Sequence, residues 1–207
     1  DDAAVAVVNT SPVDGALGIS VSQPVQVTFS DPLANTTGVR VLNGMAPVGA
    51  VSTLSPDGRV VTLTPTFAWP DSRELTIEAK TTVTDIFGRH PAQTFTSRFI
   101  TQDLSPPTVA AIAPASLSIQ NEPTATVTVT FSEPLAETTD LENLVRLSQG
   151  AVLLPGTITL AEANQAVFVP IAPLPINANL SVVVNGARDP SGNTQTTAFS
   201  STFKTLD

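Results

Sequence analysis

The stretch Val27-Thr-Phe-Ser-Asp-Pro-Leu33 returns as Val129-Thr-Phe-Ser-Glu-Pro-Leu135, at an offset of 102 residues. Further segments repeat in the same order, at offsets of 104 or 105: Asp85-Ile-Phe-Gly88 as Asp189-Pro-Ser-Gly192, Phe95-Thr-Ser-Arg-Phe99 as Phe199-Ser-Ser-Thr-Phe203, and Trp69-Pro70 as Leu174-Pro175. Collinear matches at a nearly constant offset mark an internal repeat. The 207-residue chain is therefore interpreted as two homologous modules of about 100 residues each.

The repeated segments lie where apolar residues occupy every second position, which is the pattern of a half-buried β-strand. Val25, Val27 and Phe29 alternate with polar residues in this way. The same alternation is expected at Val61, Leu63, Leu75, Ile77, Ala79, Phe95, Phe99, Val127, Val129, Phe131, Val167, Val169, Leu180, Val182, Val184, Phe199 and Phe203. Turn signals such as Asn43-Gly44 and Asn185-Gly186 separate the runs. The sequence therefore predicts all-β modules of about seven strands each, folded as β-sandwiches.

The composition supports this fold class and excludes others. The 18 Pro and 11 Gly residues exclude a helical bundle, and one helical turn is expected at 139–144, capped by Thr139 or Asp140. The absence of cysteine excludes disulfides, thiolate metal sites and cysteine catalysis. No apolar run reaches the roughly 18 residues of a membrane-spanning helix, so we expect no membrane insertion.

The charge distribution argues against nucleic acid as a partner. Nine Lys and Arg residues against 18 Asp and Glu residues give a net charge of −9, and no two basic residues are adjacent. Phosphate binding requires a basic stripe, which this chain lacks. The acidic excess is spread over both modules, so it describes the whole surface and not a tail.

The boundary between the modules is placed near residue 104, giving domains at 1–104 and 105–207 with a linker at about 102–109. Pro106-Pro107 favours an extended polyproline II conformation in this linker. A short, proline-containing connection is stiffer than a Gly/Ser tether. We expect the isolated chain to be a monomer whose natural partners are neighbouring repeats of a longer parent chain.

The order of these motifs resembles the bacterial Ig-like domain of the S-layer (SbsA-type) family. The resemblance rests on Pro12-Val-Asp-Gly-Ala-Leu-Gly18, the Phe-Ser-Asp/Glu-Pro motif, Gly58-Arg-Val-Val-Thr-Leu-Thr-Pro65 and the Asp-x-x-Gly motif. The second copy departs from it at Pro114-Ala-Ser-Leu-Ser-Ile-Gln120, which lacks the glycines. The resemblance implies two tandem immunoglobulin-like or fibronectin III-like sandwiches, a location outside the cell or in the bacterial cell envelope, and structural or adhesive work without catalysis.

Two loops have the residues of a tight turn and of a calcium site. In Asp85-x-x-Gly88 and Asp189-x-x-Gly192, glycine supplies a positive φ and the aspartate bonds its own backbone. Calcium needs six to eight oxygen ligands, for which Asp189, Asn193, Asp85 and Asp103 are the candidates. The second loop is the stronger candidate because the first has Arg89 where the second has Asn193. No other cofactor is expected.

Three further residue types are interpreted as structural. Asp31 and Glu133 are expected to accept hydrogen bonds from the backbone amides of the turns that they open. His90 is the only histidine and is expected in a solvated loop, without the partners of a catalytic triad. Trp69 takes the position of Leu174 in the second copy, which favours a place in the core over a sugar-stacking platform.

These observations predict a non-catalytic spacer or stalk of a bacterial surface or secreted protein, which also contributes to adhesion. The alternative is a module of an adhesin or secreted hydrolase that binds a glycan or protein ligand through its inter-strand loops. The stretches 43–58 and 148–164 differ between the two copies, which favours this alternative.

Overall fold

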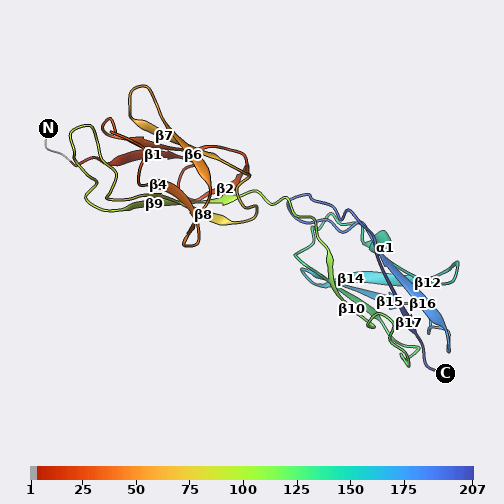
Figure 1. Ribbon diagram of the computed structural model, residues 1–207. Helices are drawn as coiled ribbons and strands as arrows, with labels where there is room; N and C mark the ends of the chain where they lie inside the picture. The colour runs from red at the N-terminus through yellow and green to blue at the C-terminus, as the bar shows by residue number, and fades with distance from the viewer. Residues whose placement is uncertain (1–3) are drawn as a thin grey trace. The chain divides into compact units, whose positions relative to one another are not determined.

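The computed structural model describes residues 4–207. The chain divides into two compact units, Asp1–Leu104 and Ser105–Asp207, each with its own sheets and its own core. Figure 1 shows strands throughout both units and a single short helix, α1. The two tandem all-β, immunoglobulin-like sandwiches expected from the sequence are confirmed.

The first unit is a sandwich of two sheets. Its strands are β1 (Val7–Ser11), β2 (Ala16–Ile19), β3 (Val25–Phe29), β4 (Val39–Asn43), β5 (Ala46–Pro47), β6 (Ala50–Leu54), β7 (Val60–Pro65), β8 (Glu74–Ala79) and β9 (Phe95–Thr101). One sheet has the order β1-β3-β7-β6 and the other β2-β9-β8-β4-β5. All neighbouring strands are antiparallel except β2 and β9, which run parallel.

The second unit repeats this arrangement with one strand fewer. Its elements are β10 (Val109–Ala113), β11 (Val127–Phe131), α1 (Leu141–Leu144), β12 (Val145–Gln149), β13 (Val152–Leu154), β14 (Gly156–Glu162), β15 (Gln165–Pro170), β16 (Asn179–Val184) and β17 (Phe199–Lys204). The sheets have the orders β10-β11-β15-β14 and β13-β12-β16-β17. The missing strand is the counterpart of β2. Its place in the second copy is taken by residues 114–120, which lack the glycines found in the first copy.

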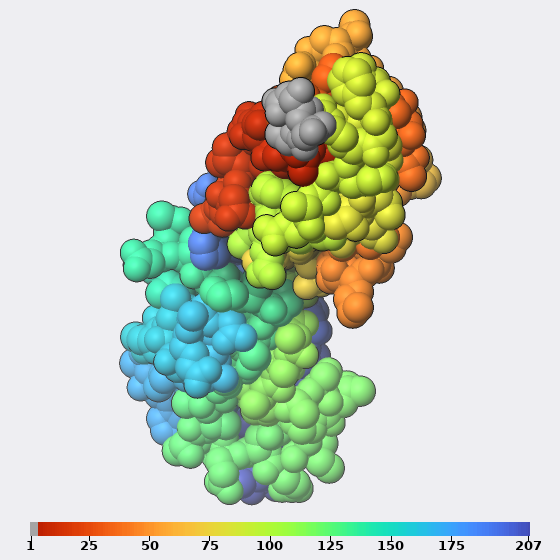
Figure 2. All heavy atoms as spheres, turned by 90° about the vertical axis from the view of Figure 1, so that its left-hand side faces the viewer, coloured from red at the N-terminus to blue at the C-terminus, as the bar shows by residue number. Residues whose placement is uncertain are grey.

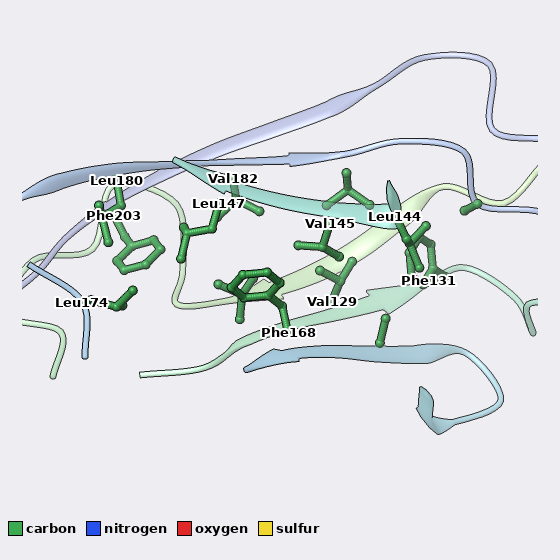
Figure 3. Packing of buried hydrophobic residues seen from close by; sticks show 14 of the residues in the cluster. Val129, Phe131, Leu144, Val145, Leu147, Phe168, Leu174, Leu180, Val182 and Phe203 are labelled. Atoms are coloured by element: carbon green, nitrogen blue, oxygen red, sulfur yellow. The ribbon is translucent and has the colours of Figure 1, made fainter. Parts of the chain in front are cut away.

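Each core lies between the two sheets because the inward-facing residues recur with period two. In β3 and β11 the valines and the final phenylalanine are buried while their polar neighbours face outward. Figure 3 shows the second core, where the side chain of Phe168 lies near Leu147 and Val182 of the opposite sheet. In the same view Val129 lies near Val145, and Phe131 lies near Leu144. Burying such side chains contributes about 1.5–3 kcal/mol each relative to leaving them exposed, so the core is the main source of stability in units that contain no disulfide.

The inward-facing positions of β15 differ from the prediction. The sequence predicts that Val167 and Val169 face the core, but Ala166 and Phe168 are buried there, and Val169 is 43% exposed. Strand pairing explains the shift, because Val129 lies opposite Ala166 and Val127 lies opposite Phe168. A one-residue change of position moves a strand residue to the opposite face of its sheet.

The predicted helical turn is present, but its capping differs from the prediction. Asp140 is the N-cap residue of α1, and its side chain makes no capping hydrogen bond to the helix backbone. Its carboxylate accepts a bond from Asn143 Nδ2 at 2.8 Å, and Thr139 Oγ1 donates to Arg188 O. Among residues 4–207, no helix is long and apolar enough to cross a membrane.

Candidate functional site

The first Asp-x-x-Gly loop, between β8 and β9, closes around the carboxylate of Asp85. This side chain is buried and accepts bonds from the amides of Phe87 at 2.9 Å and Arg89 at 2.8 Å. Gly88 has a φ of +80° and donates its amide to Asp85 O, which completes the turn. Asp85 therefore holds its own loop together, in the turn geometry that the sequence indicates.

Arg89 joins this loop to the turn after β3. Its Nε lies 2.6 Å from Asp85 Oδ2, and its NH2 group lies 3.0 Å from Asp31 Oδ1. The guanidinium also stacks over Phe87, 5.3 Å from the ring centroid. One cation thus ties two carboxylates from segments more than 50 residues apart in the sequence.

The ion pair determines the charge state of the buried acid. Burial raises the pKa of Asp85, but hydrogen bonds from the amide and side chain of Arg89 and from the Phe87 amide outweigh burial. The pKa of Asp85 consequently lies below its ordinary value of 3.8. The hydrogen bond to Asp85 in turn raises the pKa of Arg89, so both groups are charged near neutral pH.

Asp31 makes contacts that differ from the predicted turn-capping role. Its Oδ2 accepts a bond from Ser30 Oγ at 2.8 Å, and its other oxygen faces Arg89. The amide of Leu33, two residues further on, donates instead to Gly58 O. Asp31 therefore links two loops through Arg89, and Glu133 is half-buried at the corresponding position of the second unit.

The second Asp-x-x-Gly loop keeps the turn but has no arginine. Asp189 is buried, and it accepts bonds from Asn193 N at 2.8 Å and Asn193 Nδ2 at 2.7 Å. Gly192, with a φ of +95°, repeats the role of Gly88. The amide of Asn193 thus takes the place of the guanidinium of Arg89 against the buried aspartate.

The remaining predicted site residues lie apart from these carboxylates within the first unit. Asp103 is half-buried and follows the end of β9, whereas Asp85 lies before its start. His90 is exposed, and its Nδ1 lies 2.9 Å from Val83 O. Trp69 is 1% exposed, and its Nε1 donates to Gln23 O at 2.7 Å, which confirms the predicted place in the core.

The second unit contains a hollow that the sequence analysis did not predict. Its volume is about 690 Å³, and it opens where the chain crosses from β13 to β14 beside α1. The lining is mainly apolar, with a polar rim: Leu141, Glu142, Asn143, Val145, Arg146, Leu147, Leu153, Leu154, Pro155, Gly156, Thr157, Ile158 and Phe168. Six consecutive lining residues, 153–158, belong to the stretch in which the two copies diverge.

A change of residue size in β14 and β15 shapes this hollow. Phe168 in the second unit corresponds to Leu63 in the first, and Gly156 corresponds to Ala50. A Cβ at Gly156 would lie 2.2 Å from Cζ of Phe168, so the ring requires a glycine there. In the first unit a bond of 2.8 Å between the hydroxyl groups of Thr36 and Ser52 links β6 to the loop between β3 and β4 instead.

Comparison with known proteins decides the family. The profile described as bacterial Ig-like domain matches residues 1–101 and again residues 103–205. The chain belongs to the bacterial Ig-like domain family. The match does not distinguish the SbsA-type subgroup within this family. No curated protein matches the chain.

Solved structures share the general fold of these two bacterial Ig-like domains at low sequence identity. A titin I-band fragment, I67-I69, is 11% identical with a TM-score of 0.44, and the alignment covers 99% of this chain and 66% of that chain. The N-terminal part of the bacterial S-layer protein SbsC is 14% identical with a TM-score of 0.37, with 98% and 44% covered. The chain thus spans less than two thirds of either structure, and such distant likenesses carry no argument about activity.

One difference between the two copies coincides with the ion-pair network. Asp31 and Arg89 occur together in the first Ig-like domain, while Glu133 and Asn193 replace both in the second. The contact between Arg89 and Asp31 accounts for this difference, but a difference between only two copies does not identify a contact from sequence. The hollow left no comparable signal, because it depends on the packing of Phe168 against Gly156.

Proposed function

We propose that the two bacterial Ig-like domains form a structural spacer of a bacterial surface or secreted protein, flanked in its parent by further repeats. The observation that carries this proposal is the path of the chain through each domain. The chain enters at one end of the sandwich and leaves at the other, so every domain adds its length to the protein. A domain with both termini at one end would add a side branch instead.

In the first domain this path follows from strand register and packing. Residues 4–7 line one hollow together with residues 91–93 and Phe95, so the incoming chain lies beside the start of β9. The last strand then runs the length of the sheet, and at its far end Gln102 N donates to Ile19 O at 2.8 Å. Seven residues of β9 at about 3.3 Å each span roughly 23 Å.

The second domain follows the same path. Val109, at the start of β10, lies opposite Phe131, and Phe199, at the start of β17, lies opposite Val184. At the other end of β17, Leu206 N donates to Asn121 O at 2.9 Å. Repeating this path allows homologous domains to be added in series.

A domain-replacement experiment in the parent protein tests the spacer proposal. Residues 1–207 are replaced by two unrelated rigid domains of similar length, and by a flexible Gly/Ser segment of equal residue number as the control. A spacer predicts that the rigid replacement preserves the surface display and reach of the parent, while the flexible one does not. Loss of function with both replacements would contradict the proposal.

The hollow in the second domain supports a second candidate function, the binding of a glycan or protein ligand. It falls within the roughly 300–1,000 Å³ typical of ligand sites and combines an apolar floor with polar groups at its rim. Arg146 NH2 is held at that rim by a bond of 2.9 Å to Asn143 Oδ1. Part of the lining of the hollow belongs to the stretch 148–164, which differs between the two copies. A binding site present in only one copy requires such a difference.

Two neighbouring residues of β13 provide a matched test of binding. Leu153 lines the hollow and is 61% exposed, whereas Val152 is 65% exposed and does not line it. Screening on glycan and peptide arrays is repeated with the variants Leu153→Asp and Val152→Asp. Binding lost only with Leu153→Asp supports the candidate, and binding that is absent or equally affected in both variants overturns it.

A further inference from the structure

We infer that the hollow in the second domain binds an extended peptide, which places a bulky apolar side chain in the hollow and a carboxylate on Arg146. The inference rests on the second candidate function, ligand binding in this hollow, and it is independent of the spacer proposal. Three features of the hollow carry it: an arginine without an acidic partner, an apolar floor and an open strand edge.

Arg146 lacks the acidic partner that its counterpart has in the first domain. Arg40 on β4 lies opposite Glu78 on β8, and its Nε lies 2.5 Å from Glu78 Oε2. Arg146 on β12 lies instead opposite Val183 on β16. Among residues 4–207, Arg146 forms no ion pair. The second domain thus presents a cation that an acidic group of a ligand can pair with.

Two consecutive hydrogen bonds hold the guanidinium of Arg146 at the rim of the hollow. Its NH2 group donates to Asn143 Oδ1 at 2.9 Å, and Asn143 Nδ2 donates to Asp140 Oδ2 at 2.8 Å. A guanidinium has five N–H groups, and it binds a carboxylate through two parallel bonds. Because the guanidinium is already held in place, pairing with a ligand costs less conformational entropy.

The charges around Arg146 favour a carboxylate over a phosphate. Arg146 is the only basic residue among those that line the hollow in the described chain, and Glu142 lines it too. Asp140 lies beside Arg146 in the small neighbouring pocket. A phosphate group carries nearly two negative charges at neutral pH, and two nearby acids would repel it. A carboxylate carries one charge, which a single arginine neutralises.

The floor of the hollow favours an apolar side chain over a sugar. Leu147, Leu154 and Phe168 are among the lining residues, and Figure 3 shows the ring of Phe168 near Leu147. The hydroxyl groups of a sugar lose water when they enter such a site, and they then need hydrogen-bond partners. Apolar side chains provide none, whereas burying a leucine, isoleucine or phenylalanine side chain against them is favourable.

One wall of the hollow is the edge of a sheet, which favours a peptide over a fatty acid. β14 is the outermost strand of its sheet and pairs on one side only, with β15. Its residues Gly156, Thr157 and Ile158 line the hollow. The unpaired side of an edge strand can hydrogen-bond to the backbone of an extended peptide. A fatty acid has an apolar chain and a carboxylate, but it has no backbone to pair with this strand.

Binding of short labelled peptides to the 207-residue chain tests the inference. The probes are end-blocked Gly/Ser/Thr peptides that carry one leucine, isoleucine or phenylalanine and one aspartate at varied separation, and each is repeated with asparagine in place of aspartate. We expect at least one aspartate peptide to bind in fluorescence anisotropy, and its asparagine form to bind about tenfold more weakly because the charge-assisted bond is lost. Equal binding of the two forms would overturn the inference, as would binding of dodecanoate but of no peptide.

Three substitutions test whether the carboxylate lies on Arg146. Val183→Glu places an acid opposite Arg146, as Glu78 lies opposite Arg40, and Val183 does not line the hollow. We expect Val183→Glu and Arg146→Gln each to weaken binding of the aspartate peptide about tenfold, to the level of its asparagine form. Glu142→Gln is the matched control, because it removes the other charge of the rim, and it should leave binding unchanged or tighter. Unchanged binding with Val183→Glu and Arg146→Gln, or equal losses with all three variants, would overturn the inference.

The outcomes separate this inference from the functions proposed above. Binding on the arrays that is lost with Leu153→Asp but survives Arg146→Gln would overturn the carboxylate contact while leaving a ligand site in the hollow. Absence of binding both on the arrays and with every labelled peptide would reject the ligand site as well. The domain replacement in the parent protein tests the spacer separately, and its result does not depend on either measurement.

Discussion

A buried serine without a partner gives a stability prediction with opposite signs in the two domains. Ser97 on β9 and Ser201 on β17 occupy equivalent positions, and both are buried. In the first domain the hydroxyl groups of Ser97 and Thr10 lie 3.4 Å apart. In the second domain Ile112 replaces Thr10, and Ser201 Oγ has no hydrogen-bond partner among the described residues.

The expected change follows from the cost of an unsatisfied buried hydroxyl, which is about 1–3 kcal/mol. Ser201→Ala removes that cost, so we expect the second domain to gain roughly 1 kcal/mol, or about 4–8 °C in its melting midpoint. Ser97→Ala breaks a pair and leaves Thr10 unsatisfied, so we expect the first domain to lose about 1 kcal/mol.

The single tryptophan allows the two domains to be followed separately. Trp69 lies in the first core, and the second domain contains no Trp or Tyr, so tryptophan fluorescence reports only the first domain while calorimetry reports both. Ile112→Thr provides the control, because it supplies the missing partner. In that background Ser201→Ala should destabilise. A lower midpoint for Ser201→Ala in the otherwise unchanged chain would refute the reasoning.

Three further predictions concern the core, the ion pair and calcium. Gly156→Ala should destabilise the second domain by about 1–3 kcal/mol because its Cβ would meet the ring of Phe168, whereas Gly49→Ala, with no contact closer than 3.7 Å, should be nearly neutral in urea unfolding. Because the pKa of Asp85 is lower in the folded state, the ionised carboxylate stabilises the first domain above the ordinary pKa of 3.8, and this stabilisation is lost as pH falls through the folded pKa. Melting curves recorded down to about pH 2 should show this loss in the first domain. Asp85→Asn should remove that part of the pH dependence. Calcium should leave the melting midpoint of the first domain unchanged, since the oxygens of Asp85 are already hydrogen-bonded. A chelator-reversible rise in the melting midpoint of the second domain alone would place a calcium site at Asp189. Unchanged melting midpoints in both domains would show that neither loop binds calcium.

The sandwich architecture was predictable because its determinants are local in the sequence. Alternating apolar residues in β3 and β11 define the buried face without any knowledge of the partner strand. The repeat made Trp69 predictable as a core residue, since its counterpart is Leu174. The error at Val169 arose where four consecutive apolar residues, 166–169, allow either register, which only pairing with β11 decides.

The site residues were less predictable because their contacts join distant segments. Arg89 reaches Asp31 across 58 positions, and sequence periodicity carries no information about such a contact. The sequence shows that the copies differ in the stretch 148–164, but it does not show a hollow there, because the hollow depends on the fit of Phe168 against Gly156. The orange segments that project from the first domain in Figure 2 belong to the β4–β7 part of the chain, which includes its divergent stretch 43–58.

End-to-end stretching of the whole chain tests the central claim, two autonomous domains in series, most directly. Attachment at Ala4→Cys and Asp207→Cys leaves both cores intact, because neither residue belongs to them. The account predicts two separate unfolding events, each releasing about 100 residues at up to about 3.6 Å per residue, or roughly 350 Å of chain before the folded length is subtracted. A single event that releases the entire chain would contradict it.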